Sequence, residues 1–303
     1  MFSAKVKSYA KINLSLNIAG TAGGYHLIDS AVCSIDIYDT VCAKPRRDAL
    51  VNVYMHGRGS EFIPPEKNNA VKAGEAFVSA FGTRGADIEI FKDIPVGAGL
   101  GGSSADAAGV LNALAKLYKI DAPAELKALA DGLGSDTGYM LRGGFARISG
   151  RGERVEPIFS PRQYNMLLFL PDSPVSTPAC YKKYDGSPDP LRADTARLCA
   201  ALAAGDFAGV AANAYNALGV PACALNPECA AALAAAGALS PSACAVTGSG
   251  SAVFALFESE ELCRWAKSRY RGKIKTRIVK TVEPRRGGAF LRNPYRLNES
   301  DTK

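Results

Sequence analysis

Apolar positions in the first half of the chain follow two different periods. Loose alternation over residues 3–19 predicts one or two strands, and further strands are expected at 32–43, 50–56 and 87–91. Residues 69–81 and 103–118 instead carry apolar side chains at helical spacing. Strands followed by helices in this way indicate an α+β fold, with helices on one side of a largely antiparallel sheet.

The pattern changes near Ser160, after a cluster of glycine and arginine at 147–154. The elements expected beyond it are a strand at 166–170, a loop at 171–190, helices at 193–217 and 227–236, a strand–turn–strand at 243–257, a helix at 260–270 and a strand at 273–282. This alternation is compatible with a ferredoxin-like domain. At ~150 residues per domain, the length of 303 residues agrees with two domains, which we predict at 1–160 and 161–303.

A glycine-rich segment leads into the helix at 103–118. Residues 95–108 read PVGAGLGGSSADAA. Glycine allows positive φ and close approach of the backbone to a ligand, and the N–H groups at the start of the helix point toward the same place. A plain helix cap would need one serine and one glycine, so the run of glycines favours a phosphate site.

Two other glycine-loop motifs fit less well. Gly97, Gly99 and Gly102 match the G-x-G-x-x-G dinucleotide motif, but Lys-Asp-Ile-Pro precedes them and a turn at 119–123 follows the helix where a strand is required. A Walker A loop is excluded because no Gly-Lys-Ser/Thr ends the segment. The loop is therefore a lysine-free one, with Ser103 and Ser104 as side-chain donors.

The loop resembles the central motif of the GHMP kinases, and two other segments extend the match. These are AKINLSLNI at 10–18, followed by GYHL at 24–27, and VTGSGSAVF at 246–254. The resemblance covers about residues 7–257. It implies a two-domain fold, ribosomal protein S5 domain 2-like at the N-terminus and ferredoxin-like at the C-terminus, and transfer of a phosphoryl group from ATP, with Mg²⁺, to an alcohol.

The same resemblance implies roles for particular residues. Lys11 and Asp136 correspond to the catalytic pair, although Thr137 and Gly138 replace the usual Val-Pro after the acid. The implied ATP-binding residues are Asn68, Pro95, Gly97, Gly99, Leu100, Gly101, Gly102, Ser103 and Ser104. No metal ligand is implied. Simpler interpretations remain open: a helix N-cap for Asp136 and for Asn68, and a surface lysine on an edge strand for Lys11.

The acceptor implied by the resemblance is the 2-hydroxyl of 4-diphosphocytidyl-2-C-methyl-D-erythritol, an intermediate of non-mevalonate isoprenoid biosynthesis. Tyr25 would stack on the cytosine and His26 would hydrogen-bond its edge. The other implied substrate contacts are Asn13, Thr177, Tyr181, Gly248, Ser249 and Gly250. Thr21-Ala22-Gly23 stands where charged residues are usual. The alternatives are another GHMP kinase, of homoserine or mevalonate type, or a catalytically silent nucleotide-binding module, which would have lost Lys11 or Asp136.

Composition adds few constraints. The net charge of +7 reflects basic residues concentrated at 264–296, but no aromatic interleaving or nucleic-acid module accompanies them, so small-molecule partners are expected rather than nucleic acid. Eight cysteines without a C-x-x-C pair are typical of buried thiols in a reducing compartment. With no signal peptide and no membrane-length apolar run, we expect a cytoplasmic protein without membrane contact, either a monomer or a homodimer.

Overall fold

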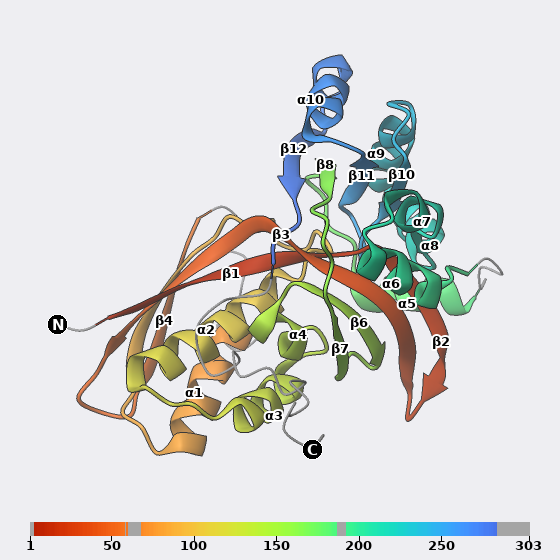
Figure 1. Ribbon diagram of the computed structural model, residues 1–303. Helices are drawn as coiled ribbons and strands as arrows, with labels where there is room; N and C mark the ends of the chain where they lie inside the picture. Colours follow the sequence, from red (N-terminus) through yellow and green to blue (C-terminus); the bar gives the residue numbers. More distant parts are fainter. Residues whose placement is uncertain (1–2, 58, 60–67, 187–191, 284–303) are drawn as a thin grey trace, which may run out of the picture.

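The computed structural model describes residues 3–57, 59, 68–186 and 192–283. Within these ranges the strands form an eight-stranded sheet and a four-stranded sheet, and the smaller sheet stands above the larger one in Figure 1. Helices α1 to α4 cover the lower side of the larger sheet in that view. The α+β fold predicted from the sequence is confirmed.

The larger sheet is organised around its longest strand, β3. Its strands are β1 (Ala4–Asn13), β2 (Ser15–Ala22), β3 (Tyr25–Pro45), β4 (Val51–His56), β5 (Ala86–Phe91), β6 (Phe145–Gly150), β7 (Arg154–Ile158) and β9 (Tyr215–Asn216). The order is β4-β5-β3-β2-β9, while β1 and β6 also pair with β3, and β7 pairs with β6. The pairing of β1 with β3 shifts between Tyr9 and Lys11, an irregularity of the kind that redirects side chains beside functional sites.

Four helices accompany this sheet: α1 (Asn69–Phe81), α2 (Gly102–Tyr118), α3 (Pro123–Leu133) and α4 (Thr137–Arg142). Helix α2 is buried along most of its length, because small residues let it approach the strands closely. A Cβ on Gly109 would lie 2.7 Å from Cγ2 of Val41 on β3. The helix expected at 103–118 therefore packs against the sheet centre and fixes the position of the glycine loop before it.

The second half has the strand order of a ferredoxin-like domain. Its strands are β8 (Asn165–Leu170), β10 (Ala243–Val246), β11 (Val253–Phe257) and β12 (Lys275–Lys280). They pair antiparallel in the order β10-β11-β8-β12. The helices of this half are α5 (Thr177–Asp185), α6 (Thr195–Ala204), α7 (Phe207–Ala212), α8 (Gly219–Leu225), α9 (Pro227–Gly237) and α10 (Glu260–Arg269).

Two expectations for this half are wrong. The helix expected at 193–217 is divided: Gly205 ends α6 in the left-handed conformation, and Asp206 caps α7 by accepting a hydrogen bond from the Gly209 N–H at 3.0 Å. The chain then forms β9 beside β2. The loop expected at 171–190 contains α5, which Ser176 caps, while residues 187–190 lie outside the described part.

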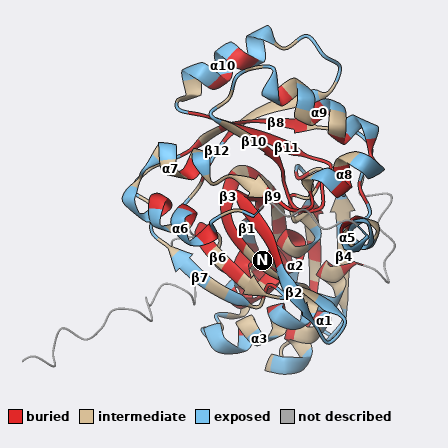
Figure 2. Cartoon of the chain, turned by 90° about the vertical axis from the view of Figure 1, so that its right-hand side faces the viewer, coloured by how far each residue is buried: buried red, intermediate tan, exposed pale blue. Residues whose placement is uncertain are grey.

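The two sheets share a hydrophobic core. One large cluster of buried side chains includes Ile12 of β1 together with Phe254 of β11, and a smaller cluster packs under α8 and α9. Figure 2 shows the buried strands of both sheets at the centre of the molecule. A bridge between Ile35 and Thr281 also joins β3 to the end of the second half. The seam between the sheets is therefore tightly held.

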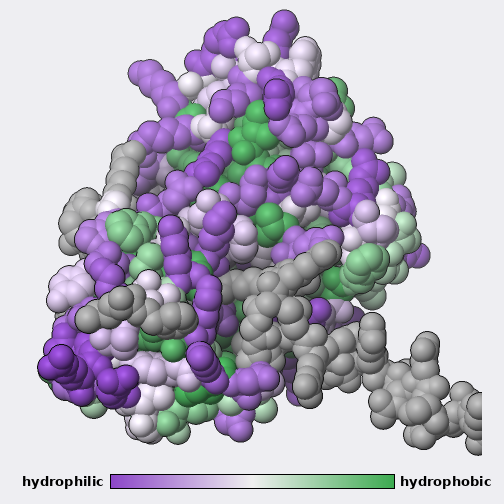
Figure 3. Space-filling model, turned by 60° about the vertical axis from the view of Figure 1, so that its left-hand side comes forward, coloured by the Kyte–Doolittle hydropathy of each residue, from purple (hydrophilic) through white to green (hydrophobic). Residues whose placement is uncertain are grey.

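Hydrophilic side chains cover most of the face shown in Figure 3, and hydrophobic ones appear there in small separate groups. Within the described ranges, no helix combines the length and apolar character needed to cross a membrane. All eight cysteines are free thiols, and half of them are buried. The basic residues after position 283, up to Arg296, lie outside the described part of the chain.

Candidate active site

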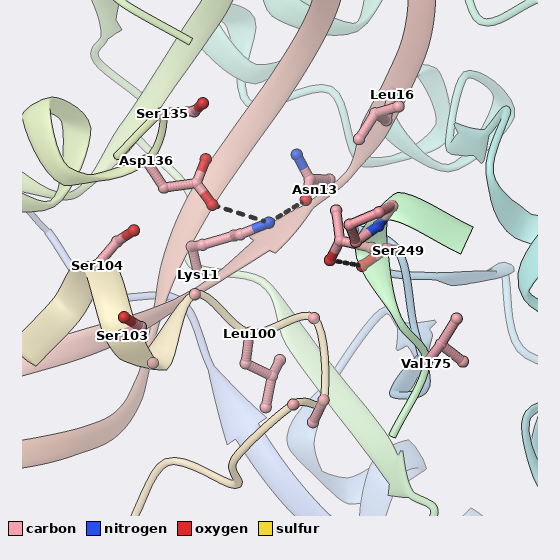
Figure 4. A pocket seen from close by; sticks show the side chains of 18 of the residues that line it. Lys11, Asn13, Leu16, Leu100, Ser103, Ser104, Ser135, Asp136, Val175 and Ser249 are labelled. Carbon is pink, nitrogen blue, oxygen red and sulfur yellow. Dashed lines mark hydrogen bonds and ion pairs between the residues drawn. The ribbon is translucent and has the colours of Figure 1, made fainter. Parts of the chain in front are cut away.

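A cavity of about 810 Å³ lies where the two halves meet. It is lined by the predicted residues Lys11, Asn13, Tyr25, His26, Asn68, Pro95, Gly97, Gly99, Leu100, Gly101, Gly102, Ser103, Ser104, Asp136, Thr177, Tyr181, Gly248 and Ser249. Gly250 belongs to the same turn as Gly248 but is not part of the lining. Segments that are far apart in the sequence thus surround one space, as Figure 4 shows from close by.

The glycine loop needs its glycines because it turns tightly and packs against backbone. Gly97, Gly99 and Gly101 have φ values of 70°, 78° and 73°, in the left-handed region. A Cβ on Gly99 would meet the carbonyl oxygen of Thr247 and lie 2.9 Å from that of Gly250. The loop is therefore docked directly on the turn between β10 and β11.

Helix α2 presents its N-terminus to the cavity. Gly101 is the N-cap residue and has no side chain to satisfy the first N–H groups, and Ser103 and Ser104 of the first turn line the cavity. Free N–H groups and the positive end of the helix dipole together attract an anion. The arrangement is suited to holding phosphate.

A buried ion cluster braces both ends of the loop. Lys92, which precedes the loop, donates to Asp39 and to Oδ2 of Asp106 on α2, the latter at 2.5 Å. Asp39 also accepts from the N–H groups of Asp93 and Ile94. Burial raises the pKa of Asp106 to about 8, because the nearby Lys92 ammonium only partly offsets it and Asp39 adds to it. Burial would lower the pKa of Lys92, but the two carboxylates raise it.

Lys11 is the polar centre of the cavity. Its side chain is 6% exposed, so it is not a surface lysine on an edge strand. Its Nζ donates to Oδ1 of Asn13 at 2.5 Å and forms an ion pair with Oδ2 of Asp136 at 3.4 Å, as the dashed lines of Figure 4 mark. Its backbone N–H donates to the carbonyl oxygen of Leu100 at 3.0 Å, which fixes the loop beside it.

The partners of Lys11 are themselves held in place. Asn13 donates from Nδ2 to the hydroxyl of Ser30 at 2.8 Å, so its Oδ1 faces Lys11. Asp136 occupies the N-cap position of α4, but its side chain makes no capping hydrogen bond. Its carboxylate is 25% exposed and remains directed toward the cavity. An ammonium, an amide and a partly exposed carboxylate therefore converge beside the phosphate-binding loop.

Aromatic rings gather at the other end of the cavity. The rings of His26 and Tyr181 are stacked with centroids 4.5 Å apart. Tyr25 is 59% exposed, and the guanidinium of Arg151 lies 5.0 Å from its ring centroid. An exposed aromatic face beside a polar ring can receive a planar base.

Four other polar residues have structural contacts in or near the cavity. Asn68 caps α1 by accepting from the N–H of Ala70 at 3.0 Å, so the cap interpretation holds, and it also lines the cavity. The hydroxyls of Thr177 and Ser249 are 2.8 Å apart and connect α5 to the β10–β11 turn. His56, the other histidine of the chain, is exposed and stacks on Phe91.

Sequence reasoning missed several residues of this region. Arg151 lines the cavity from the turn between β6 and β7, and Ser135 lines it from the position before Asp136, but neither was among the predicted site residues. The brace of Asp39, Lys92 and Asp106 was also missed, although Asp106 stands alone as an acid in an alanine-rich helix. A charged residue at such a position indicates a buried partner.

Comparison with known proteins gives concordant matches. Residues 68–146 match the GHMP kinases N terminal domain. A 4-diphosphocytidyl-2-C-methyl-D-erythritol kinase of Pelotomaculum thermopropionicum is 37% identical over 284 residues, which cover 91% of this chain and 97% of that protein. A relative of the same name from Desulfitobacterium hafniense is 38% identical, covering 84% of this chain and 87% of its own length.

Solved structures agree. A crystal structure of 4-(cytidine 5'-diphospho)-2C-methyl-D-erythritol kinase superposes with a TM-score of 0.74 at 29% identity, covering 91% of this chain and 98% of that one. Homoserine kinase from Cytophaga hutchinsonii gives a TM-score of 0.71 at 18% identity, with coverage of 93% and 95%. The second likeness is one of fold alone.

Proposed function

Since the chain belongs to the 4-diphosphocytidyl-2-C-methyl-D-erythritol kinase family of the GHMP kinases, we propose that it transfers the γ-phosphoryl group of ATP to the 2-hydroxyl of 4-diphosphocytidyl-2-C-methyl-D-erythritol. This reaction serves non-mevalonate isoprenoid precursor biosynthesis. The observation that carries the proposal is the pairing of Lys11 with Asp136 beside a glycine loop at a helix N-terminus. We also assign the enzyme to the cytoplasm, which suits its free thiols.

Phosphoryl transfer depends mainly on positioning and on stabilising charge. The phosphates of ATP bind the N–H groups of residues 97–104 and the start of α2, with Asn68 near the nucleoside. The substrate hydroxyl donates a hydrogen bond to the Asp136 carboxylate, which orients the hydroxyl or takes its proton. Lys11 keeps the Asp136 carboxylate in position and places a positive charge where negative charge develops on the transferred group.

The cavity also suits the Mg²⁺ that such kinases use. Mg²⁺ commonly takes one or two protein oxygens and otherwise phosphate oxygens and water. Ser104 and Asp136 both line the cavity together with the glycine loop, so a hydroxyl and a carboxylate are available there. Ser104 and Asp136 would hold the ion, which would neutralise charge on the phosphates.

The acceptor binds across the seam. Tyr25 and His26 take the cytosine, while Thr177, Tyr181, Gly248 and Ser249 line the path from the base to Asp136. The N–H groups of Gly248 and Ser249, two residues that line the cavity, suit the diphosphate. Asn13 contacts the methylerythritol portion through the Nδ2 hydrogen that Ser30 does not accept.

An acceptor panel tests this function. The enzyme is mixed with ATP, Mg²⁺ and either 4-diphosphocytidyl-2-C-methyl-D-erythritol, homoserine or mevalonate, and ADP release is followed. We expect turnover with the cytidyl alcohol alone, at a rate on the order of 1–100 s⁻¹. Comparable kcat/KM with homoserine or mevalonate would assign another acceptor. Binding of ATP without ADP release on any acceptor would indicate a silent module.

A further inference from the structure

The imidazole of His26 is held from behind by a carboxylate that does not line the cavity. Nε2 of His26 lies 2.7 Å from Oδ1 of Asp185. The His26 side chain is 19% exposed and that of Asp185 is 55% exposed. The two residues come from β3 and from the end of α5, so the contact joins the two halves of the molecule at the cavity rim.

Helix α5 contributes to both sides of this ring. Tyr181 stacks on the imidazole, and Asp185 follows it by about one helical turn, so the two side chains lie on the same face of the helix. The stacking restricts the plane of the imidazole, and the carboxylate restricts its rotation within that plane. His26 is therefore oriented before any ligand binds.

The place of Asp185 indicates that its partner matters. Asp185 is the last residue of α5, where the helix dipole disfavours a negative charge and favours the lysines that also occupy this turn, Lys182 and Lys183. Among the described residues, the partner of the Asp185 carboxylate is the His26 ring. The hydrogen bond to His26, which crosses the seam between the two halves, thus offsets the unfavourable position of the Asp185 charge at the C-terminal end of α5.

This hydrogen bond decides which ring nitrogen carries the proton. A carboxylate only accepts, so in a neutral imidazole Nε2 must be the donor and Nδ1 must keep its lone pair. Within the described ranges, Nε2 is the ring nitrogen that has a protein partner, and Nδ1 remains for a ligand. His26 consequently offers an acceptor to the cavity.

Building on the proposed function, we propose that Asp185 is a positioning residue that fixes His26 as the Nε2–H tautomer and thereby selects cytosine over uracil. Cytosine carries an amino group at C4, which donates to Nδ1, whereas uracil carries a carbonyl oxygen there, which faces the Nδ1 lone pair without a hydrogen. A site built to pair with a donor rejects the analogue that lacks it. Asp185, which does not line the cavity, therefore sets the selectivity for the base through the His26 tautomer.

The tautomer is measured directly by ¹⁵N NMR of histidine-labelled enzyme at pH 8. The chain has only two histidines, and a His26→Ala spectrum assigns the signals. Wild type is expected to show His26 protonated at Nε2 and unprotonated at Nδ1. Asp185→Ala is expected to populate both tautomers, Asp185→Asn to keep the wild-type one through its amide oxygen, and Lys183→Ala on the same helix to change nothing.

Binding of CDP and UDP in the presence of a saturating non-hydrolysable ATP analogue measures the selectivity without catalysis. In Asp185→Ala, affinity for CDP is expected to fall about threefold to tenfold, the range of one hydrogen bond, with UDP little affected. KM for the cytidyl alcohol should rise by a similar factor while kcat and KM for ATP stay near wild type. Asp185→Asn restores most of the CDP preference.

Two results would overturn the proposal: a wild-type His26 ring protonated at Nδ1, or an unchanged tautomer and CDP preference in Asp185→Ala. These outcomes are separate from a failure of the proposed function. If wild type does not phosphorylate the cytidyl alcohol, the kinase assignment is wrong, but the NMR spectra and the ratio of CDP to UDP affinity still decide the role of Asp185.

Discussion

At the scale of single residues, the site depends on a buried lysine that connects an amide to a carboxylate. The positions of Lys11 and Asn13 follow from the sequence, since residues two apart on a strand share a face. The resemblance to the GHMP kinases implies the pairing of Lys11 with Asp136, but the local pattern cannot predict it, because 125 positions separate the two residues and long-range packing of α4 brings the acid near β1. Asp185 belongs to no recognised motif, so the sequence alone did not indicate its contact with His26.

Removal of either charge should abolish most turnover and leave ATP bound. For Lys11→Ala and Asp136→Asn we expect kcat to fall about 100-fold or more, because each variant loses charge stabilisation or hydroxyl orientation in the transition state. The dissociation constant for ATP should change by less than about threefold, since the loop and α2 bind the phosphates independently. Steady-state kinetics and calorimetry with ATP make the comparison. Loss of ATP binding in both variants would instead make the pair structural.

At the scale of elements, the glycine loop works because two backbones touch. Most of the elements around it are visible in the sequence, since α1, α2 and β5 have clear periods. The division of 193–217 into α6, α7 and β9 is not visible, because the many alanines favour one continuous helix. Only Gly205, as a helix stop, and Asp206, as an N-cap, indicate the break.

Gly99→Ala tests this backbone contact, with Gly82→Ala as the matched control. Both glycines have positive φ, 78° and 59°, but a Cβ on Gly82 meets nothing within 4 Å. Gly82→Ala should cost about 1–2 kcal/mol of stability from φ alone and leave kinetics unchanged. Gly99→Ala should cost more and raise KM for ATP, because the loop must leave the Thr247 carbonyl. Equal denaturation midpoints and equal KM values in the two variants would show that the contact is unimportant.

The brace beside the loop predicts a pH dependence. With its pKa raised to about 8, the Asp106 carboxyl is neutral at pH 7 and negative at pH 9. A new negative charge next to bound phosphate weakens binding, so KM for ATP should rise from pH 7 to pH 9, by about threefold to tenfold if the charges interact by about 1 kcal/mol. Lys92, whose pKa is raised, faces the same carboxyl and keeps its charge over this range.

Asp106→Asn supplies the comparison, since its amide can still accept from Lys92 and cannot ionise. Its KM for ATP should vary less between pH 7 and pH 9 than that of wild type, with circular dichroism confirming the fold at both ends. Superimposable pH profiles for the two proteins would exclude Asp106 as the titrating group.

At the scale of the whole molecule, the cavity exists because two sheets share a seam. Lys11, Asp136 and the glycine loop come from the first half, whereas Tyr181 and Ser249 come from the second. The alternation of elements suggested a ferredoxin-like second half, and motifs suggested the site residues, but neither could give the strand order or place β9 beside β2 and Thr281 beside Ile35. Such contacts depend on long-range packing. The division at 1–160 and 161–303 and the oligomeric state stay predictions.

If the cavity binds ATP at the glycine loop and the cytidyl alcohol at its other end, the preference for cytosine should depend on the His26 side chain. We would measure kcat/KM for the cytidine and uridine forms of the diphospho-alcohol with wild type, His26→Ala and Tyr25→Ala. His26→Ala should raise KM for the cytidine form roughly tenfold or more, since an unpaired polar contact costs about 1–3 kcal/mol, and should reduce the preference for cytidine while KM for ATP stays constant. Tyr25→Ala should weaken both bases alike. Equal losses toward ATP and acceptor in His26→Ala, or an unchanged base preference, would contradict the cytidine site and leave a kinase of other specificity.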